Sequence, residues 1–276
     1  MKSKKLFPVA CNRIPLLLVA CAFISLGEAA AAAAQELPAQ AKPVQGLLVP
    51  VPKEIFRTLD QFQNANWRAV QRSEIVRWKS QGDQVQVALL LGVVVGEGFI
   101  AMESQDVKEI KDVGQRVLVL GRALGVEQTA LRRSRSIIDH AERNDWAGAR
   151  KEWDNVLTDL EQGMIALKSE PLSHLVSLSG WLRGTEALSI LVMQDYSANR
   201  AELLRQTAIL DYLEQQLLAI NKQTQRHTLV TKMLAGLRKI RTSLQNDGNV
   251  VTEKTVHEIG DICRGLVVAI SQHSAS

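Results

Sequence analysis

Residues 87–102 read VALLLGVVVGEGFIAM and residues 172–193 read LSHLVSLSGWLRGTEALSILVM, and these two stretches decide the fold. Apolar side chains would cover every direction around a helix built from either stretch. The charges are Glu97 in the first stretch and Arg183 and Glu186 in the second. In water, a helix that is apolar on all sides must be covered by other helices. We therefore predict that both helices lie at the centre of a helical bundle.

The chain from residue 53 onward also has helical periodicity, without the alternation of apolar and polar residues that is typical of strands. The clearest stripe follows a predicted N-cap at Asp145 and contains Trp146, Ala149, Trp153, Val156, Leu160, Met164 and Leu167. Helix breaks are predicted at residues 81–83, 125, 144–145, 170–171, 196–197 and 246–249. The pattern predicts an all-α fold, a single antiparallel multi-helix bundle over residues 53–276 with two central apolar helices.

Both central stretches contain glycines four residues apart, Gly92 and Gly96 in the first and Gly180 and Gly184 in the second. A glycine inside a helix costs about 1 kcal/mol relative to alanine. A pair on one helix face is therefore expected where a second helix backbone must come close. We predict that the two central helices cross near these four glycines.

The charges within the central helices are their most suggestive feature. Glutamate and arginine are almost never fully buried without a partner, and an uncompensated buried charge is strongly destabilising. We expect Arg183 to bridge Glu186 on its own helix and Glu97 across the crossing. Two interpretations stay open. The three residues form either a buried ion network that fixes the helix register, or a pocket where Arg183 binds an anionic ligand or a carboxylate acts as a base.

Residues 1–34 have the order of a secretory signal peptide. Three lysines and Arg13 precede an apolar run at residues 14–26, and small residues at 29–34 supply an Ala-x-Ala cleavage site. The apolar run is shorter than the ~20 residues that a helix needs to cross a bilayer. We expect cleavage near Ala34 and export to a Gram-negative periplasm.

Cys21 offers an alternative end for the leader, because Leu18-Val19-Ala20-Cys21 fits the pattern of a bacterial lipoprotein. Lipidation at Cys21 would tether the protein to the envelope. The residues after Cys21 stay apolar, whereas a lipidated cysteine usually opens a polar tether, so we expect ordinary cleavage. Residues 35–52 then read QELPAQAKPVQGLLVPVP and are predicted to form a Pro/Ala-rich linker.

Removing the leader changes the charge of the chain. Of 33 basic and 29 acidic residues, the leader holds four and one, which leaves 29 and 28 and a net charge of +1. A near-neutral protein has no electrostatic footprint for nucleic acid. Neither central stretch is a good membrane span, because each carries charge at mid-length, so we expect no transmembrane span in the mature chain. Cys263 is then the single remaining cysteine and is predicted to be a small core residue.

The sequence contains no recognisable catalytic motif. A Gly-x-Ser-x-Gly elbow, a P-loop, a dinucleotide fingerprint and a zinc-binding His-Glu-x-x-His are all absent. The paired Glu-x-x-His motifs of di-iron bundles are absent as well. We therefore expect no cofactor, no metal site and no catalytic residue. Trp67 and Trp78, on a predicted first helix after the linker, are candidate partner-facing residues, and the alternative is that they pack against the bundle.

Two segments, Gly180-Trp-Leu-Arg-Gly-Thr-Glu186 and Ala201-Glu-Leu-Leu-Arg-Gln206, resemble stretches of uncharacterised exported bacterial helical proteins. The resemblance covers residues 85–217 and implies a helical fold and an exported compartment, but no activity or cofactor. We expect an exported, non-enzymatic helical-bundle protein that binds a protein or envelope component in the periplasm. The alternative is a small-ligand sensor or enzyme built around Glu97, Arg183 and Glu186.

Overall fold

A computed structural model describes residues 51–62, 64–80 and 83–272. The chain divides into two units, Met1–Gln35 and Glu36–Ser276, and all described residues belong to the second. The predicted signal peptide, Cys21 and linker residues 35–50 lie outside the described residues. The last two residues of the predicted linker, Val51 and Pro52, instead begin the first helix. Proline is tolerated in a first helical turn, where its missing N–H would have no intrahelical acceptor.

Every regular element among the described residues is helical, which confirms the predicted all-α class. The α-helices (α) and 3-10 helices (η) are α1 Val51–Leu59, η2 Asp60–Phe62, η3 Trp67–Ala69, η4 Ile75–Arg77, α2 Gln84–Glu103, α3 Val107–Ala123, α4 Glu127–Glu142, α5 Trp146–Ala166, α6 Glu170–Gln194, α7 Ala198–Ala201, η5 Glu202–Leu204, α8 Thr207–Ala219, α9 Lys222–Gln225, α10 Thr228–Asn246 and α11 Glu253–Ser271.

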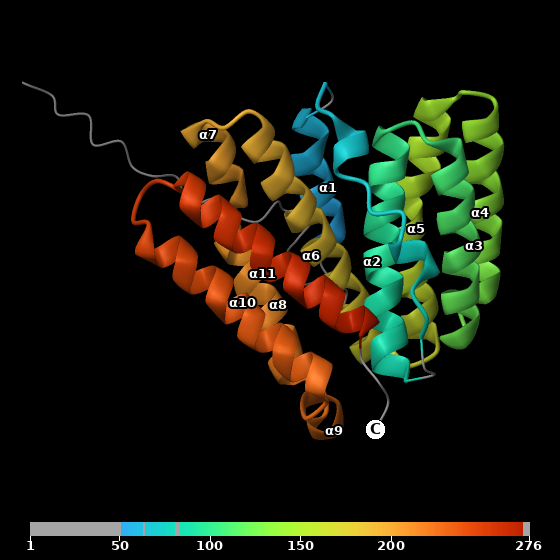
Figure 1. Cartoon of the computed structure of the whole chain (residues 1–276). Helices are drawn as coiled ribbons and strands as arrows, with labels where there is room; N and C mark the ends of the chain where they lie inside the picture. Colours follow the sequence, from blue (N-terminus) through green and yellow to red (C-terminus); the bar gives the residue numbers. More distant parts are fainter. Residues whose placement is uncertain (1–50, 63, 81–82, 273–276) are drawn as a thin grey trace, which may run out of the picture. The chain divides into compact units, whose positions relative to one another are not determined.

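The helices α2 and α6 form the centre of this bundle, as predicted. They pack against each other; α2 also packs against α3, and α6 also packs against α11 and α1. In Figure 1, α3, α4 and α5 lie on one side of the central pair, and α8, α10 and α11 lie on the other. Every residue of α2 from Val85 to Met102 is buried. Burial of one such Val or Leu side chain stabilises the fold by about 1.5–3 kcal/mol, so the central pair supplies much of the core.

By length and composition, α2 is the one described helix that could cross a membrane. Its most apolar window is entirely buried inside the bundle, however. Core helices of globular proteins have this same composition, because they too are surrounded by apolar groups. The absence of a transmembrane span in the mature chain stays a prediction.

The crossing of α2 and α6 lies at Gly92 and Gly96. A Cβ atom on Gly92 would lie 2.0 Å from the carbonyl oxygen of Val176, and one on Gly96 would lie 3.4 Å from the carbonyl oxygen of Gly180. Three of the four predicted glycines are therefore at the crossing. Gly184 is elsewhere, since its Cβ would lie 2.7 Å from Ile55 of α1. The prediction was wrong for Gly184, because the face of α6 that carries this glycine packs against α1.

Residues 60–80 are not a continuous helix, contrary to the prediction for the segment after the linker. α1 ends early and three short 3-10 turns follow it. The apolar residues that this segment buries are five, three and five positions apart, a spacing that no single face of an α-helix accommodates. They are Phe62, Trp67, Val70 and Ile75.

Trp67 faces the core. Its side chain is 3% exposed, its indole N–H donates to the carbonyl oxygen of Phe62 at 3.0 Å, and its ring meets Phe99 edge-on. The partner-facing role predicted for Trp67 is wrong, and the alternative, packing against the bundle, holds. Trp78 is half-buried and also packs against the core.

The helix ends follow local chemistry that the sequence makes visible. Gly125 and Asn144, at two predicted breaks, have positive φ angles of 80° and 55°. The Asp145 side chain accepts a hydrogen bond from the Gly148 N–H and caps α5, as predicted. Leu167, the last member of the predicted stripe, instead lies at the C-cap of α5 and is 51% exposed. The helix ends before this residue can turn toward the core.

Candidate functional site

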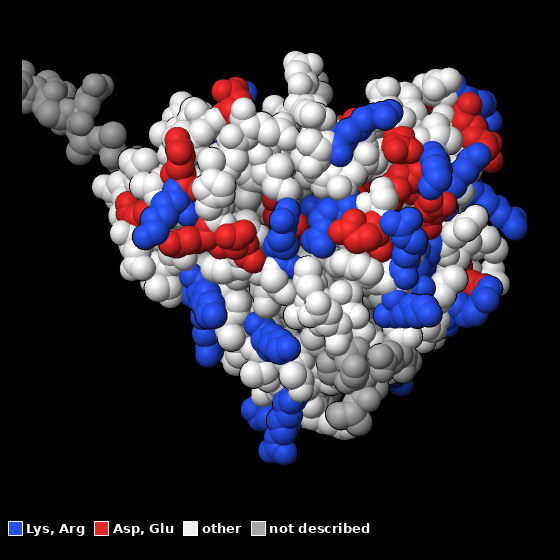
Figure 2. Space-filling model, in the orientation of Figure 1, with Lys and Arg blue, Asp and Glu red and all other residues white. Residues whose placement is uncertain are grey.

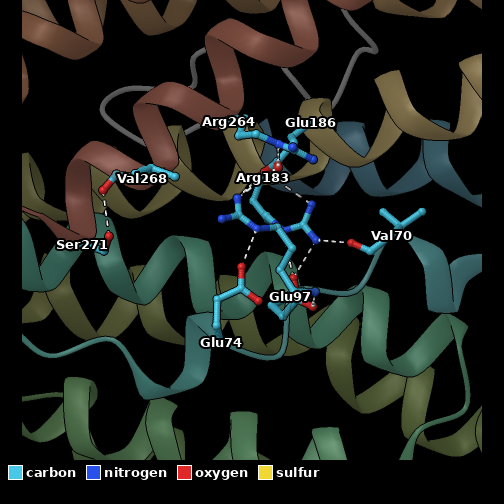
Figure 3. A network of polar contacts seen from close by, with 9 residues as sticks. Val70, Glu74, Glu97, Arg183, Glu186, Arg264, Val268 and Ser271 are labelled. Carbon is cyan, nitrogen blue, oxygen red and sulfur yellow. Dashed lines mark hydrogen bonds and ion pairs between the residues drawn. The ribbon is translucent and has the colours of Figure 1, made fainter.

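The structure brings Glu97, Arg183 and Glu186 together at the α2–α6 crossing (Figure 3). The Arg183 Nε atom donates to Glu97 Oε2 at 2.8 Å, and its Nη2 atom lies 2.7 Å from the same oxygen. The Arg183 Nη1 atom lies 3.6 Å from Glu186 Oε2. Their side chains are 0%, 0% and 1% exposed for Glu97, Arg183 and Glu186. Arg183 therefore bridges the two helices as expected.

The irregular segment before α2 supplies partners that sequence reasoning missed. The backbone N–H of Arg72 donates to Glu97 Oε1 at 2.6 Å, and its Nη1 atom donates to Glu186 Oε1 at 3.0 Å. The carbonyl oxygen of Val70 accepts from Arg183 Nη2 at 2.6 Å. No periodicity could have indicated these contacts, because the segment has no regular helix to set a face. We call Arg72, Glu97, Arg183 and Glu186 the Arg183 cluster.

Two further charges lie at the rim of the Arg183 cluster. Glu74 accepts from Arg72 Nε at 2.9 Å. Arg264 of α11 donates from Nε to Glu186 Oε1 at 3.3 Å, while its side chain is 58% exposed. The cluster thus ties α2, α6, α11 and the segment before α2 to one another. Its four members carry two positive and two negative charges, so the buried centre is neutral as a whole.

The balance of charge keeps Arg183 ionised. Burial acts against the charged guanidinium, but the Glu97 and Glu186 carboxylates outweigh it and raise the pKa of Arg183. Each carboxylate oxygen of Glu97 and Glu186 already faces a donor from Arg72, Arg183 or Arg264. Hydrogen bonds of this charge-assisted kind are stronger than those between neutral groups. The charge-assisted contacts of Glu97 and Glu186 join α2, α6 and α11 at this point.

A pocket of about 410 Å³ adjoins the Arg183 cluster between α6 and α11. Of the three charges predicted from the sequence, Glu186 alone reaches it; Glu97 and Arg183 do not. Its lining consists of Glu186, Ser189, Ile190, Met193, Gln194, Val256, His257, Gly260, Asp261 and Arg264. The pocket is a feature that periodicity could not indicate, because it depends on how α11 lies against α6.

Neither metal nor thiol chemistry is suggested by the described part of the chain. Among residues 51–62, 64–80 and 83–272, no three His, Cys, Asp or Glu side chains are grouped so that they could hold a metal ion. Cys263 is fully buried, and burial raises the pKa of its thiol. A buried thiol with a raised pKa is a poor nucleophile, which fits its predicted place as a small core residue.

Burial disfavours the charged forms of two titratable groups outside the Arg183 cluster. Burial raises the pKa of Glu161 on α5 from 4.5 to about 7. Burial also lowers the pKa of His174 on α6 from 6.5 to about 4. The Glu161 Oε1 and His174 Nδ1 atoms are buried and have no hydrogen-bond partner in the described structure. Both groups therefore link stability to pH.

We expect these two links to oppose each other. Folded Glu161 keeps a proton that the unfolded chain releases, so stability falls as pH rises from 4.5 to about 7. His174 stays unprotonated in the folded protein at pH values where it is protonated in the unfolded chain. The stability of the folded state therefore falls as pH drops from 6.5 to about 4. Between pH 4.5 and 6.5 the contributions of Glu161 and His174 to the pH dependence of stability oppose each other in the unaltered protein.

Single variants should show the pH dependence that each group gives to the free energy of unfolding, measured with urea between pH 4.5 and 6.5. Glu161→Gln should make the free energy of unfolding rise with pH, and His174→Gln should make it fall, each by up to ~1.4 kcal/mol per pH unit. Identical pH profiles for the two variants would contradict the burial of one or both groups.

The resemblance to exported helical proteins implies no activity. The Arg183 cluster and the adjoining pocket are described features that involve the charges predicted from the sequence. The chain matches no protein-family model, no curated protein and no solved structure.

Proposed function

We propose that this chain is an exported, non-enzymatic helical-bundle protein that binds a protein or envelope component in the periplasm. The observation that carries the proposal is the pairing within the Arg183 cluster, in which both buried carboxylates are already engaged by arginine and backbone donors. The buried charges then serve the fold, and binding is left to the surface of the bundle. The order of residues 1–34 supports export.

The surface supports a protein partner better than a polyanion. Figure 2 shows charged side chains of both signs gathered in a band across one face of the molecule. Mixed charge of this kind complements another protein, in which both signs also occur. A nucleic acid would instead call for a continuous positive stripe, which this face does not present.

Native mass spectrometry of the protein purified from the envelope of the cells that produce it tests this function. We expect a complex that releases a second macromolecule on activation. A double variant, Glu97→Gln with Arg183→Met, should keep the complex if it keeps its fold, because the cluster acts through the fold alone. A bare monomer, or a monomer with only a small bound molecule, would contradict the proposed function.

The mass of the processed chain tests the compartment in the same measurement. Cleavage near Ala34 gives an unmodified chain, whereas processing at Cys21 gives a longer chain with attached lipid. A Cys21→Ala variant is the matched control, since it can lose membrane attachment only in the second case. An unprocessed chain in the cytoplasm would contradict export.

The alternative, a small-ligand sensor or enzyme built around Glu97, Arg183 and Glu186, has one observation in its favour. The pocket between α6 and α11 reaches Glu186. It does not reach Glu97 or Arg183, so a ligand in it would meet only the outer edge of the cluster. Loss of a co-purified metabolite in an Arg183→Met variant that stays folded would favour this alternative.

A further inference from the structure

The pocket beside the Arg183 cluster is a groove between two antiparallel helix segments. Residues 186–194 of α6 form one wall and residues 256–264 of α11 form the other. The two helices approach closely at Gly260, where a Cβ atom would lie 3.1 Å from the Ser189 Cβ. Gly260 thus lies opposite Ser189, and Arg264 lies opposite Glu186. The two helices therefore run in opposite directions along the groove. Eight helical steps make it about 12 Å long.

One end of the groove is charged, and the other is richer in apolar side chains. Glu186, Asp261 and Arg264 lie toward one end, while Met193 and Val256 lie toward the other. Glu186 is buried and held by Arg72 and Arg183 of the cluster. The remaining lining residues are Ser189, Ile190, Gln194, His257 and Gly260. The groove therefore suits a small molecule with a polar head and an apolar tail.

Two opposite charges at the polar end are open to a ligand. Asp261 makes no hydrogen bond or ion pair with any described residue. Arg264 uses its Nε atom on Glu186, and its two terminal nitrogens have no partner among the described residues. Asp261 and Arg264 are three residues apart on α11, so their Cβ atoms are neighbours on the helix surface at about 5–6 Å. Even so, the two side chains do not form an ion pair with each other.

We propose that this groove binds a zwitterionic α-amino acid with an apolar side chain. The ligand carboxylate accepts hydrogen bonds from the terminal N–H groups of Arg264, and its ammonium group donates to Asp261. The apolar side chain lies along Ile190 and Met193. The inference does not rest on the protein-binding role proposed above, because it concerns a different class of ligand.

The charges of the lining disfavour ligands that carry a single charge. A ligand with only a carboxylate would bring its negative charge beside Asp261 and Glu186, and one with only an ammonium group would face Arg264. A zwitterion satisfies both open charges at once. The volume of about 410 Å³ falls near the lower end of the roughly 300–1,000 Å³ that is usual for small-molecule sites.

Isothermal titration of the full chain with L-leucine, N-acetyl-L-leucine and L-leucinamide tests the inference. The two capped compounds keep the apolar side chain, but each removes one of the two charges. We expect L-leucine to bind and each capped compound to bind about tenfold or more weakly, because each loses a charge-assisted contact. Equal binding of either capped compound, or no heat from L-leucine at roughly 10 mM, would overturn the inference.

Two variants locate the site on α11. Asp261→Asn and Arg264→Gln should each weaken L-leucine binding about tenfold or more. Asp139→Asn and Arg135→Gln, at exposed positions on α4 that form no ion pair with a described residue, are matched controls and should leave binding unchanged. Thermal unfolding without ligand checks that Arg264→Gln remains folded. Unchanged binding in both α11 variants would place the ligand elsewhere and overturn the inference.

Discussion

Replacing Arg183 with methionine is expected to lower the free energy of unfolding by about 3–5 kcal/mol, because one partner of a buried ion pair is removed. Methionine fills much of the space of the arginine stem, so a cavity is not the main effect. Glu97 would keep one hydrogen bond from the Arg72 backbone but lose its ion pair in a site that is 0% exposed. Chemical denaturation with urea at pH 7 measures the loss.

A double variant separates the cost of an unpaired charge from the value of the pair. Glu97→Gln with Arg183→Met removes both charges and should lose less stability than Arg183→Met alone. Arg133→Met is the matched surface control, since Arg133 pairs with Glu152 and Asp159 while 25% exposed. It should cost about 1 kcal/mol or less. If the double variant is as unstable as the single one, the unpaired charge is not the cause.

Gly92→Ala is expected to lower the free energy of unfolding by about 3 kcal/mol or more, because the added methyl group overpacks the α2–α6 crossing. Its carbon would lie 2.0 Å from the Val176 carbonyl oxygen and 2.2 Å from the Ser179 Oγ atom. A backbone oxygen cannot turn aside as a flexible side chain can. The two central helices would have to move apart, and thermal or urea unfolding would show the loss.

Two other glycines serve as controls for Gly92. Gly265 in α11 has nothing within 4 Å of its Cβ position, so Gly265→Ala should raise stability by about 1 kcal/mol. Gly114 in α3 has its nearest neighbour at 3.4 Å, an ordinary contact, so alanine there should be tolerated. Destabilisation by Gly265→Ala equal to that of Gly92→Ala would show that helix crossing is not the reason.

The Gly92 and Arg183 variants should not be additive. The crossing that Gly92 permits also brings Glu97 within reach of Arg183 across the same pair of helices. Separating the helices by Gly92→Ala would already weaken the ion pair. Adding Arg183→Met should then lower the free energy of unfolding by less than it does in the unaltered protein. Residues coupled through one backbone shift commonly show such interaction energies.

Composition and periodicity were enough to predict the helical class and the two central helices. A helix over residues 87–102 has no polar face, so its apolar side chains are removed from water only inside a bundle. The meeting of Glu97, Arg183 and Glu186 could be predicted for a similar reason. A buried charge in a central helix needs an opposite charge as its partner. The two central stretches contain few charges, so the possible pairings are few. Most helix ends were also visible, because a break such as Gly125 depends on local backbone conformation.

The partners from outside the central helices could not be predicted. Arg72 lies in a segment without periodicity, and Arg264 lies on α11 next to buried residues with nothing in the pattern to distinguish it. Trp67 was misassigned for the same reason, since its burial follows from the path of an irregular segment. Gly184 was misassigned because a glycine indicates a close neighbour but not which one.

The sequence by itself determined most of the helical segments, which two helices are buried, and that their charges must be paired. These properties depend on spacing along the chain and on the cost of leaving apolar surface or charge without a partner. Only the tertiary structure decided which groups complete the Arg183 cluster and that a groove lies between α6 and α11. Both depend on the direction in which separate elements cross. Residues distant in the chain meet only once those crossings are formed.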